Sequence, residues 1–137
     1  MIESAVRNLL LSYPAVTVLV STRVYPDILP QDPAYPAITY QEISGPRDYT
    51  LDGPDGVVTH RVQLDFWGAT AASAAAVRDA VEGSISGVHH IDTGSPAIRI
   101  HGVFIDNSRG SFESALDASD SSPYRRGFDI AITVSTA

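Results

Sequence analysis

The sequence predicts an α+β fold: a single domain over residues 1–137, with two helices packed on one face of a mainly antiparallel, four-stranded sheet. Two segments carry apolar residues at helical spacing, and four others alternate apolar and polar residues as half-buried strands do. These segments follow one another in the order helix, strand, strand, helix, strand, strand. With 137 residues, 44% of them apolar, the chain can form one domain with its own core.

The first helix is expected at residues 2–11, where apolar side chains recur every three or four positions. Glu3 stands in its first turn, where the helix dipole favours a carboxylate. Pro14 ends this helix, because the residue before a proline avoids the helical region. Residues 15–20 fit either a short helical turn or a buried strand, and we favour the helical turn.

The first two strands follow a proline-rich connection. Residues 23–36 contain four prolines and are expected to run extended, with a short strand at Val24 as an option. Residues 37–44 alternate well enough for a strand. The clearest strand is residues 57–68, where His60 falls on the apolar side and suits a hydrogen-bonded core or rim position. Its apolar face consists of Val58, Val62, Leu64 and Phe66, and its polar face of Thr59, Arg61, Gln63 and Asp65.

The second helix is expected at residues 70–87. Thr70 is a suitable N-cap, because its hydroxyl can accept a hydrogen bond from a backbone N–H of the first turn. An alanine-rich flank lets this helix approach the sheet closely. Its apolar stripe consists of Ala74, Val77, Val81 and Ile85.

The last two strands are expected at residues 97–106 and 124–135, and residues 89–96 are expected to form a turn. The apolar face of the earlier strand consists of Ile98, Ile100 and Phe104, and that of the later strand of Phe128, Ile130, Ile132 and Val134.

Two long loops are expected, at residues 45–56 and 107–123, the second of them Ser-rich and mobile. The first lies in the stretch SGPRDYTLDGPDG, which is rich in Gly and Asp and suggests a phosphate, a metal ion or a protein neighbour as its ligand. A phosphate loop needs a Lys, which the chain lacks, and a dinucleotide fingerprint needs a helix where a strand follows here. A calcium loop beginning at Asp48 places Thr59 where a Glu belongs. Protein contact is therefore the preferred interpretation.

The ionisable and nucleophilic residues form no pattern typical of an enzyme. The chain has no Cys, no His pair has zinc-motif spacing, and the cluster of His89, His90 and Asp92 suits a solvated turn. No nucleophile elbow surrounds a Ser. Asp117 and Asp120 fall in the Ser-rich loop, where burial cannot raise a carboxyl pKa. We therefore expect no enzymatic activity, no catalytic residue, no cofactor and no metal site.

The charge balance argues against nucleic-acid binding. The formal net charge is −7 and every basic residue apart from His is Arg, whereas phosphate binding depends on an excess of basic contacts. No run of apolar residues is long enough to span a membrane, and the first residues lack the basic start of a signal peptide. The expectation is a protein made in a cytoplasm, with no membrane partner.

Across residues 2–134 the sequence resembles the tail completion or tail terminator family of long-tailed bacteriophages, which includes prophage and gene-transfer-agent relatives. The resemblance rests on Arg-Val-Tyr-Pro at 23–26, Pro-Ala-Ile-Thr-Tyr at 36–40 and Val-Gln-Leu-Asp-Phe-Trp at 62–67. The alanine-rich helix and the last two strands follow in the family's order. Residues 110–123 depart from the family pattern, so the resemblance assigns that loop no role.

The resemblance implies a structural protein of an α+β fold without catalytic residues. It implies a homo-oligomeric ring, usually a hexamer, at the head-proximal end of the tail tube. Such a ring stops tube polymerisation and offers a surface for joining the head. Its partners are the tail tube protein and a head-side connector, and it resides in the virion tail after assembly in the host cytoplasm. DNA passes through its lumen without specific binding, which suits an acidic chain.

Several side chains are candidates for contacts between subunits. Trp67 suits either an interface anchor or packing beneath the following helix. Most surface charges of this kind contribute under about 1 kcal/mol even when paired. The candidate interface residues are Arg47, Asp48, Tyr49, Asp52, Asp55, Arg61, Asp65, Trp67, Arg109, Phe112, Arg125 and Asp129.

Two rival functions remain at this stage. A head-side connector or neck protein of the same particle would share a small α+β plan and ring symmetry. A small ligand-binding α+β domain is the second rival, and a concave pocket with converging buried polar groups would favour it.

Overall fold

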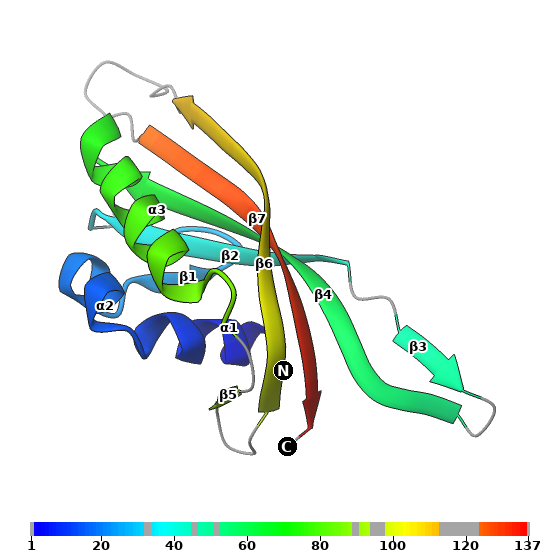
Figure 1. The fold of residues 1–137 in the computed structure, drawn as a ribbon. Helices are drawn as coiled ribbons and strands as arrows, with labels where there is room; N and C mark the ends of the chain where they lie inside the picture. The colour runs from blue at the N-terminus through cyan, green and yellow to red at the C-terminus, as the bar shows by residue number, and fades with distance from the viewer. Residues whose placement is uncertain are drawn as a thin grey trace.

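The computed structural model describes residues 2–31, 34–44, 47–50, 53–88, 91–93, 98–112 and 124–136, which form three helices and seven strands (Figure 1). The helices are α1 (Ile2–Leu11), α2 (Pro14–Val20) and α3 (Ala71–Ile85). The strands are β1 (Val24–Pro26), β2 (Ala37–Ser44), β3 (Arg47–Thr50), β4 (Gly53–Gly68), β5 (Ile91–Thr93), β6 (Ile98–Phe112) and β7 (Tyr124–Thr136).

Within this described part, the strands form one mixed sheet in the order β1-β2-β4-β7-β6-β5, and β3 pairs with β4 outside that path. The β1–β2 pair is parallel and the other pairs are antiparallel. The α+β class is confirmed, but the four-stranded antiparallel sheet, the two helices and the predicted element order are wrong. The short strand offered as an option at Val24 is confirmed as β1, whereas the added strand β5 has only three residues, too few for alternation to identify it.

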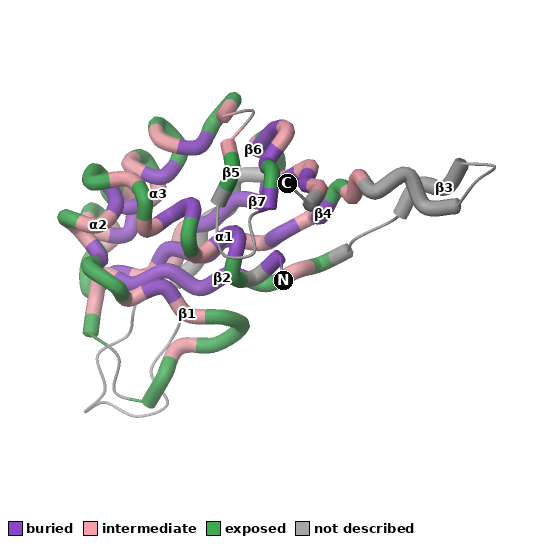
Figure 2. Tube along the Cα trace, turned by 90° about the horizontal axis from the view of Figure 1, so that it is seen from below, coloured by how far each residue is buried: buried purple, intermediate pink, exposed green. Residues whose placement is uncertain are grey.

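One face of the sheet is covered by the helices and forms the core, as the band of buried residues in Figure 2 shows. Phe66 of β4 and Phe128 of β7 lie at its centre, with ring centroids 5.1 Å apart. The predicted α3 stripe is fully buried, and so is its counterpart on β7. We call this the helix-covered face and the opposite side the open face. The sheet residues buried on the helix-covered face include Ile38, Tyr40, Val62, Leu64, Phe66, Ile100, Val103, Phe128, Ile130 and Ile132.

The residues at the starts of α2 and α3 explain where these helices begin. Residues 15–20 do form a helix, α2, which begins with Pro14 at its first position, where a proline's missing N–H is not needed. In α3 the N-cap prediction is confirmed. The Ser73 backbone N–H donates to Thr70 Oγ1 at 3.1 Å, and the Thr70 backbone N–H donates to Ser73 Oγ at 3.3 Å.

A β-bulge in β6 reverses one predicted orientation. Ile100 pairs with Val134 and Gly102 with Thr133, so one extra residue is inserted between them. Because alternation restarts after the bulge, Val103 enters the core and Phe104 turns to the open face, 64% exposed. The placement of Phe104 on the apolar side with Ile98 and Ile100 is therefore wrong.

Segments expected to be irregular contain strands. Residues 47–50 form β3 and β4 already begins at Gly53, so much of the loop expected at 45–56 is a hairpin. Figure 1 shows β3 and the start of β4 reaching away from the rest of the molecule. The turn expected at 89–96 contains β5, and β6 continues to Phe112 inside the loop expected at 107–123. Residues 113–123 lie outside the described residues.

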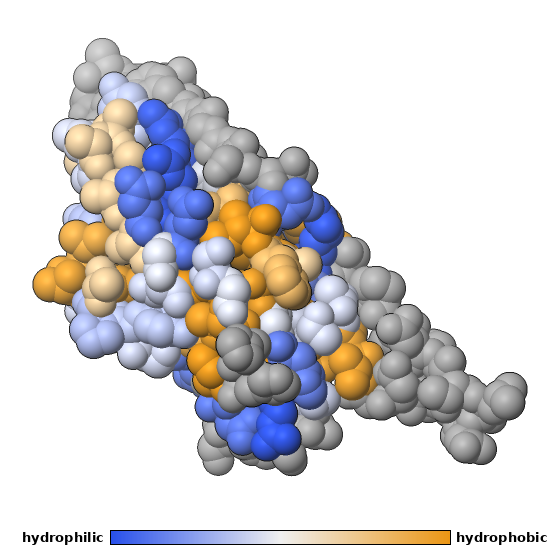
Figure 3. All heavy atoms as spheres, viewed as in Figure 1, coloured by the Kyte–Doolittle hydropathy of each residue, from blue (hydrophilic) through white to orange (hydrophobic). Residues whose placement is uncertain are grey.

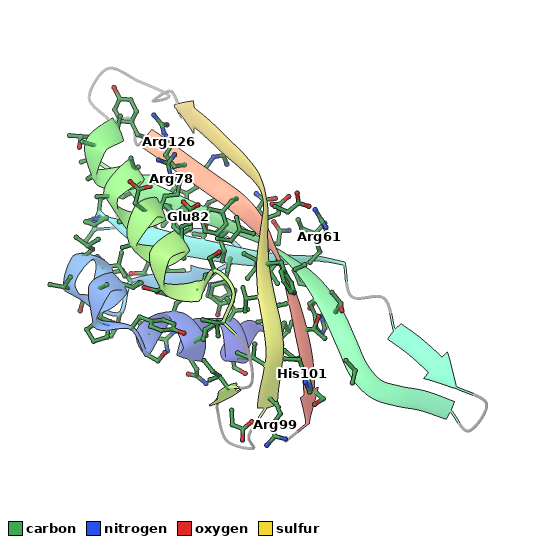
Figure 4. The ribbon with its side chains drawn as sticks, viewed as in Figure 1. Arg61, Arg78, Glu82, Arg99, His101 and Arg126 are labelled. Carbon is green, nitrogen blue, oxygen red and sulfur yellow. The ribbon has the colours of Figure 1, made fainter. Side chains whose placement is uncertain are left out.

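An exposed ion pair joins β5 to β6. The Arg99 guanidinium donates to both carboxylate oxygens of Asp92, at 2.8 and 3.1 Å (Figure 4 labels Arg99). These hydrogen bonds hold the pKa of Asp92 below its ordinary value of 3.8. The stability that this pair contributes is thus present above that value and lost as the pH falls through the lowered pKa of the folded protein.

Arg99→Gln is expected to return the Asp92 pKa to its ordinary range, because the charged donor is removed. An NMR titration of the Asp92 carboxyl carbon measures this shift. Arg78→Gln is the matched control, since Arg78 lies on α3 and pairs with Asp79. An Asp92 pKa unchanged by Arg99→Gln would contradict the pairing.

Candidate protein interface on the open face

The open face of the sheet carries the candidate residues whose side chains the structure describes. Neighbouring strands place Thr39 beside Asp65, Gln63 beside Asp129, and Trp67 beside Arg125. The odd-numbered residues of β4 point to this face because their even-numbered neighbours fill the core. The structure therefore brings together Arg61, Asp65, Trp67, Arg125 and Asp129, which lie on two adjacent strands.

Arg61 is engaged within its own subunit. Its guanidinium donates to the Asp106 carboxylate, so the pair links β4 to β6 across the intervening β7. Figure 4 shows Arg61 extending from the sheet away from α3. The side chains are 38% and 51% exposed. A pair so open to solvent contributes at most about 1 kcal/mol, and it leaves the remaining guanidinium N–H donors for a neighbour.

A pocket of about 310 Å³ lies on the open face at the C-terminal end of β4. The Trp67 indole forms part of its wall, and Trp67 Nε1 donates to Thr39 Oγ1 at 2.9 Å. The Arg125 guanidinium lies 5.3 Å from the centre of the Trp67 ring, a cation–π distance. Of the two positions considered for Trp67, the structure thus shows the open face and not the underside of α3. We call this the Trp67 pocket; it is lined by Asp27, Ile28, Leu29, Thr39, Gln41, Gln63, Asp65, Trp67 and Arg125.

Two carboxylates are buried on this face. Asp65 is 7% exposed and accepts a hydrogen bond from Gln63 Nε2 at 2.9 Å, and Asp129 is 9% exposed. A buried carboxylate is tolerated only when hydrogen bonds or charges compensate its lost hydration. These two groups therefore belong to the polar packing of the subunit itself, and Asp65 also lines the Trp67 pocket.

Apolar side chains are also exposed near these polar groups. Ile28 is 78% exposed at the Trp67 pocket, and Ile43 is 50% exposed at the irregular end of the β2–β4 pairing. On the side of the molecule that carries the helices, drawn in Figure 3, apolar residues likewise reach the surface in patches between polar ones. Phe104 and Ile28 were not identified from the sequence. The exposure of Phe104 depends on the bulge in β6. Ile28 belongs to a proline-rich connection, where no periodicity indicates which residues are buried and which are exposed.

The remaining candidates lie elsewhere or outside the described side chains. Arg47, Asp48 and Tyr49 belong to β3 and Asp55 to the start of β4, at the far end of β4 from the Trp67 pocket. Asp52 is outside the described residues. The side chains of these five, and of Arg109 and Phe112 on β6, are also outside them.

His60 lies at the rim of the helix-covered face and is 6% exposed, so its predicted burial is confirmed. Its Nδ1 lies 2.9 Å from Glu42 Oε2, but within the described part of the chain neither ring nitrogen has a partner at hydrogen-bond geometry. His60 is thus buried as predicted, without the predicted hydrogen bond among those residues.

Over the described ranges, no three His, Asp or Glu side chains come close enough to hold a metal ion. No helix in that same part of the chain is long and apolar enough to cross a membrane.

Comparison with known proteins identifies the family to which the sequence is similar. The family model described as "Tail completion protein gp17" matches residues 4–135. A chain in the solved structure titled "Virion of native gene transfer agent (GTA) particle" is similar in fold, with a TM-score of 0.56 and 17% identity. The alignment covers 91% of this chain and 86% of that one, and at this identity it shows the fold alone. None of the curated proteins matches the sequence.

Proposed function

The chain belongs to the family of tail completion protein gp17, and from this premise we propose that it is a non-enzymatic structural protein of a phage-type tail. In this proposal, copies of the chain form a ring, expected to be hexameric, on the head-proximal end of the tail tube. The ring ends tube polymerisation and presents the surface to which the head is joined.

The observation that carries this proposal is the extent of the family match. It spans residues 4–135, so it includes all of the sheet except Thr136 and most of α1, and not just one motif. The surface supports it as well. Outside the filled core, the molecule offers an open sheet face with exposed Phe104 and Ile28 and a projecting β3–β4 hairpin. Apolar and aromatic anchors among polar groups are typical of protein interfaces.

The role has a simple physical basis. A tube of stacked identical rings grows because each added ring presents the same unsatisfied face again. A terminating ring must match that face on one side and present a different surface on the other. The net charge of −7 suits a lumen through which DNA moves, because an acidic wall does not bind phosphate. A basic lumen in an assembled ring would contradict this last point.

The proposed role predicts the length of tail tubes assembled in vitro. Adding the purified protein to polymerising tail tube protein is expected to shorten the tubes and to leave a ring at one end, measured by negative-stain electron microscopy. An unrelated acidic protein of similar size is the control. Tubes of unchanged length without end-bound rings would contradict a terminator, and rings on heads but not on tubes would favour a head-side connector.

A further inference from the structure

The β3–β4 hairpin lacks a supporting surface within the described part of its own chain. Arg47 pairs with Val58, Tyr49 with Pro54 and Thr50 with Gly53, and β3 has no other paired strand in that part. Figure 1 shows the hairpin extended away from the helices and the rest of the sheet. A two-stranded ribbon is marginally stable in water by itself. A hairpin in this position therefore calls for a surface outside the subunit.

The Trp67 pocket lies at the opposite end of the same strand. The hairpin contains Gly53 at the start of β4, and Trp67 is the penultimate residue of β4. At about 3.3 Å per residue, these two positions are roughly 45 Å apart along the strand. A subunit thus cannot place its own hairpin in its own pocket. Two different surfaces at opposite ends of one strand can meet only between copies, head to tail.

The chemistry of the two surfaces is compatible. The Trp67 pocket combines exposed Ile28 with an indole and a guanidinium, and its volume of about 310 Å³ admits a few side chains of a hairpin turn. In the sequence, residues 47–56 contain one Tyr, three Asp and one Arg. An Arg guanidinium has five N–H donors, so Arg125 can share them between partners in its own subunit and a carboxylate of the next copy.

We propose that the β3–β4 hairpin of one copy docks in the Trp67 pocket of the next copy of this chain. The contact is heterologous, and a repeated heterologous contact closes into a ring when the rotation between copies permits it. This inference rests on the proposed ring, because it supplies the joint between neighbouring subunits. The occupant of the pocket is a second copy of the chain, not a small molecule.

Cross-linking between variants tests the joint directly. The sequence has no Cys, so each introduced thiol is unique. Asp52→Cys, between β3 and β4 in the sequence, and Ile28→Cys at the pocket are purified separately, mixed, and treated with a short bis-maleimide, with and without tail tubes. A covalent dimer is expected in the mixture and not in either variant alone. Val18→Cys is the matched control, because Val18 is 80% exposed against 78% for Ile28 but does not line the pocket.

Cross-linking of Asp52→Cys to Val18→Cys as strongly as to Ile28→Cys would overturn the proposal, as would no dimer with Ile28→Cys under either condition. A second arm compares Ile28→Arg with Val18→Arg, each checked for folding by circular dichroism. Ile28→Arg is expected to lose the ring, measured by native mass spectrometry and electron microscopy, and Val18→Arg to keep it. Rings that persist in Ile28→Arg contradict the docking.

The outcomes separate this inference from the tail-end role. Wild-type protein that shortens tubes while the cross-link is absent would overturn the hairpin contact and leave the tail-end role supported. Cross-linked rings that leave tube length unchanged would support the hairpin contact and overturn the tail-end role. Replacement of residues 48–55 by a short Gly-Ser turn adds a third check: the folded subunit is expected to remain, and the ring to be lost.

Discussion

Phe128→Ala is expected to lower the free energy of unfolding by about 3–5 kcal/mol, the usual range for removing a fully buried aromatic side chain. Phe128 has no solvent exposure, and its ring packs at 54° against Phe66 of the neighbouring strand. Its strand, β7, lies between β4 and β6, so backbone on both sides limits how far the core can collapse into the cavity. Urea denaturation followed by Trp67 fluorescence measures the loss.

Phe104→Ala is the matched control for this prediction. It removes the same side chain from a position that is 64% exposed, so the free energy of unfolding is expected to change by no more than about 0.5 kcal/mol. Comparison of the two variants also tests the bulge in β6. If Phe104→Ala destabilised the protein as strongly as Phe128→Ala, Phe104 would be in the core and alternation would run through Gly102 without interruption.

The elements with long, regular patterns could be predicted from the sequence. The four-residue stripe of α3, from Ala74 to Ile85, is buried as predicted, because helical spacing alone decides which side chains share a face. On β4, alternation placed Val62 and Leu64 in the core and Arg61 and Gln63 opposite. These assignments depend on neighbours within the same segment, and the sequence contains that information directly.

Pairings between distant segments could not be predicted. The β6 bulge exists because Ile100 and Gly102 match consecutive residues of β7. Gly102 is the local sign of it, since a Gly inside a strand often accompanies a bulge, but the alternation of the apolar residues did not show where the register shifts. Strand β3 has Gly and Pro on either side, which is typical of a loop, and its pairing to β4 overrides that composition. Three-residue strands such as β5 gain their conformation from a partner and not from their own propensity.

The candidate interface likewise has one part that the sequence predicted and one part that it did not. Alternation on β4 predicted that Asp65 shares the polar face with Arg61, and it does; Trp67, left open between two positions, lies on the same face. The pocket itself depends on Ile28 and Leu29, from the proline-rich connection, lying next to that face. No periodicity relates residues 28 and 67, so their proximity follows from the path of the chain after β1. For the same reason the sequence showed charged candidates but not the apolar part of the pocket.

Gly68→Ala is expected to destabilise the fold by about 1–3 kcal/mol through overpacking. A Cβ at this position would lie 2.2 Å from Ser73 Oγ and 2.6 Å from the backbone N of Ala74. The Ser73 hydroxyl could rotate away, but the Ala74 backbone is part of the first turn of α3 and cannot move without shifting the helix. Displacing Ser73 also breaks its reciprocal contact with Thr70, and loss of an N-cap costs about 1 kcal/mol more.

Gly83→Ala, within α3 itself, is expected to have the opposite effect on stability. A Cβ there meets nothing within 4 Å, so the substitution is expected to raise the free energy of unfolding by about 0.5–1 kcal/mol, because Ala loses less backbone entropy in a helix. Urea denaturation of both variants gives the signs, and Thr70→Ala separates the loss of the cap from the backbone clash. If Gly68→Ala were as stabilising as Gly83→Ala, the close approach of β4 to the start of α3 would be wrong. If it cost no more than Thr70→Ala, the loss of the cap would explain the whole effect and the Ala74 backbone would have room to adjust.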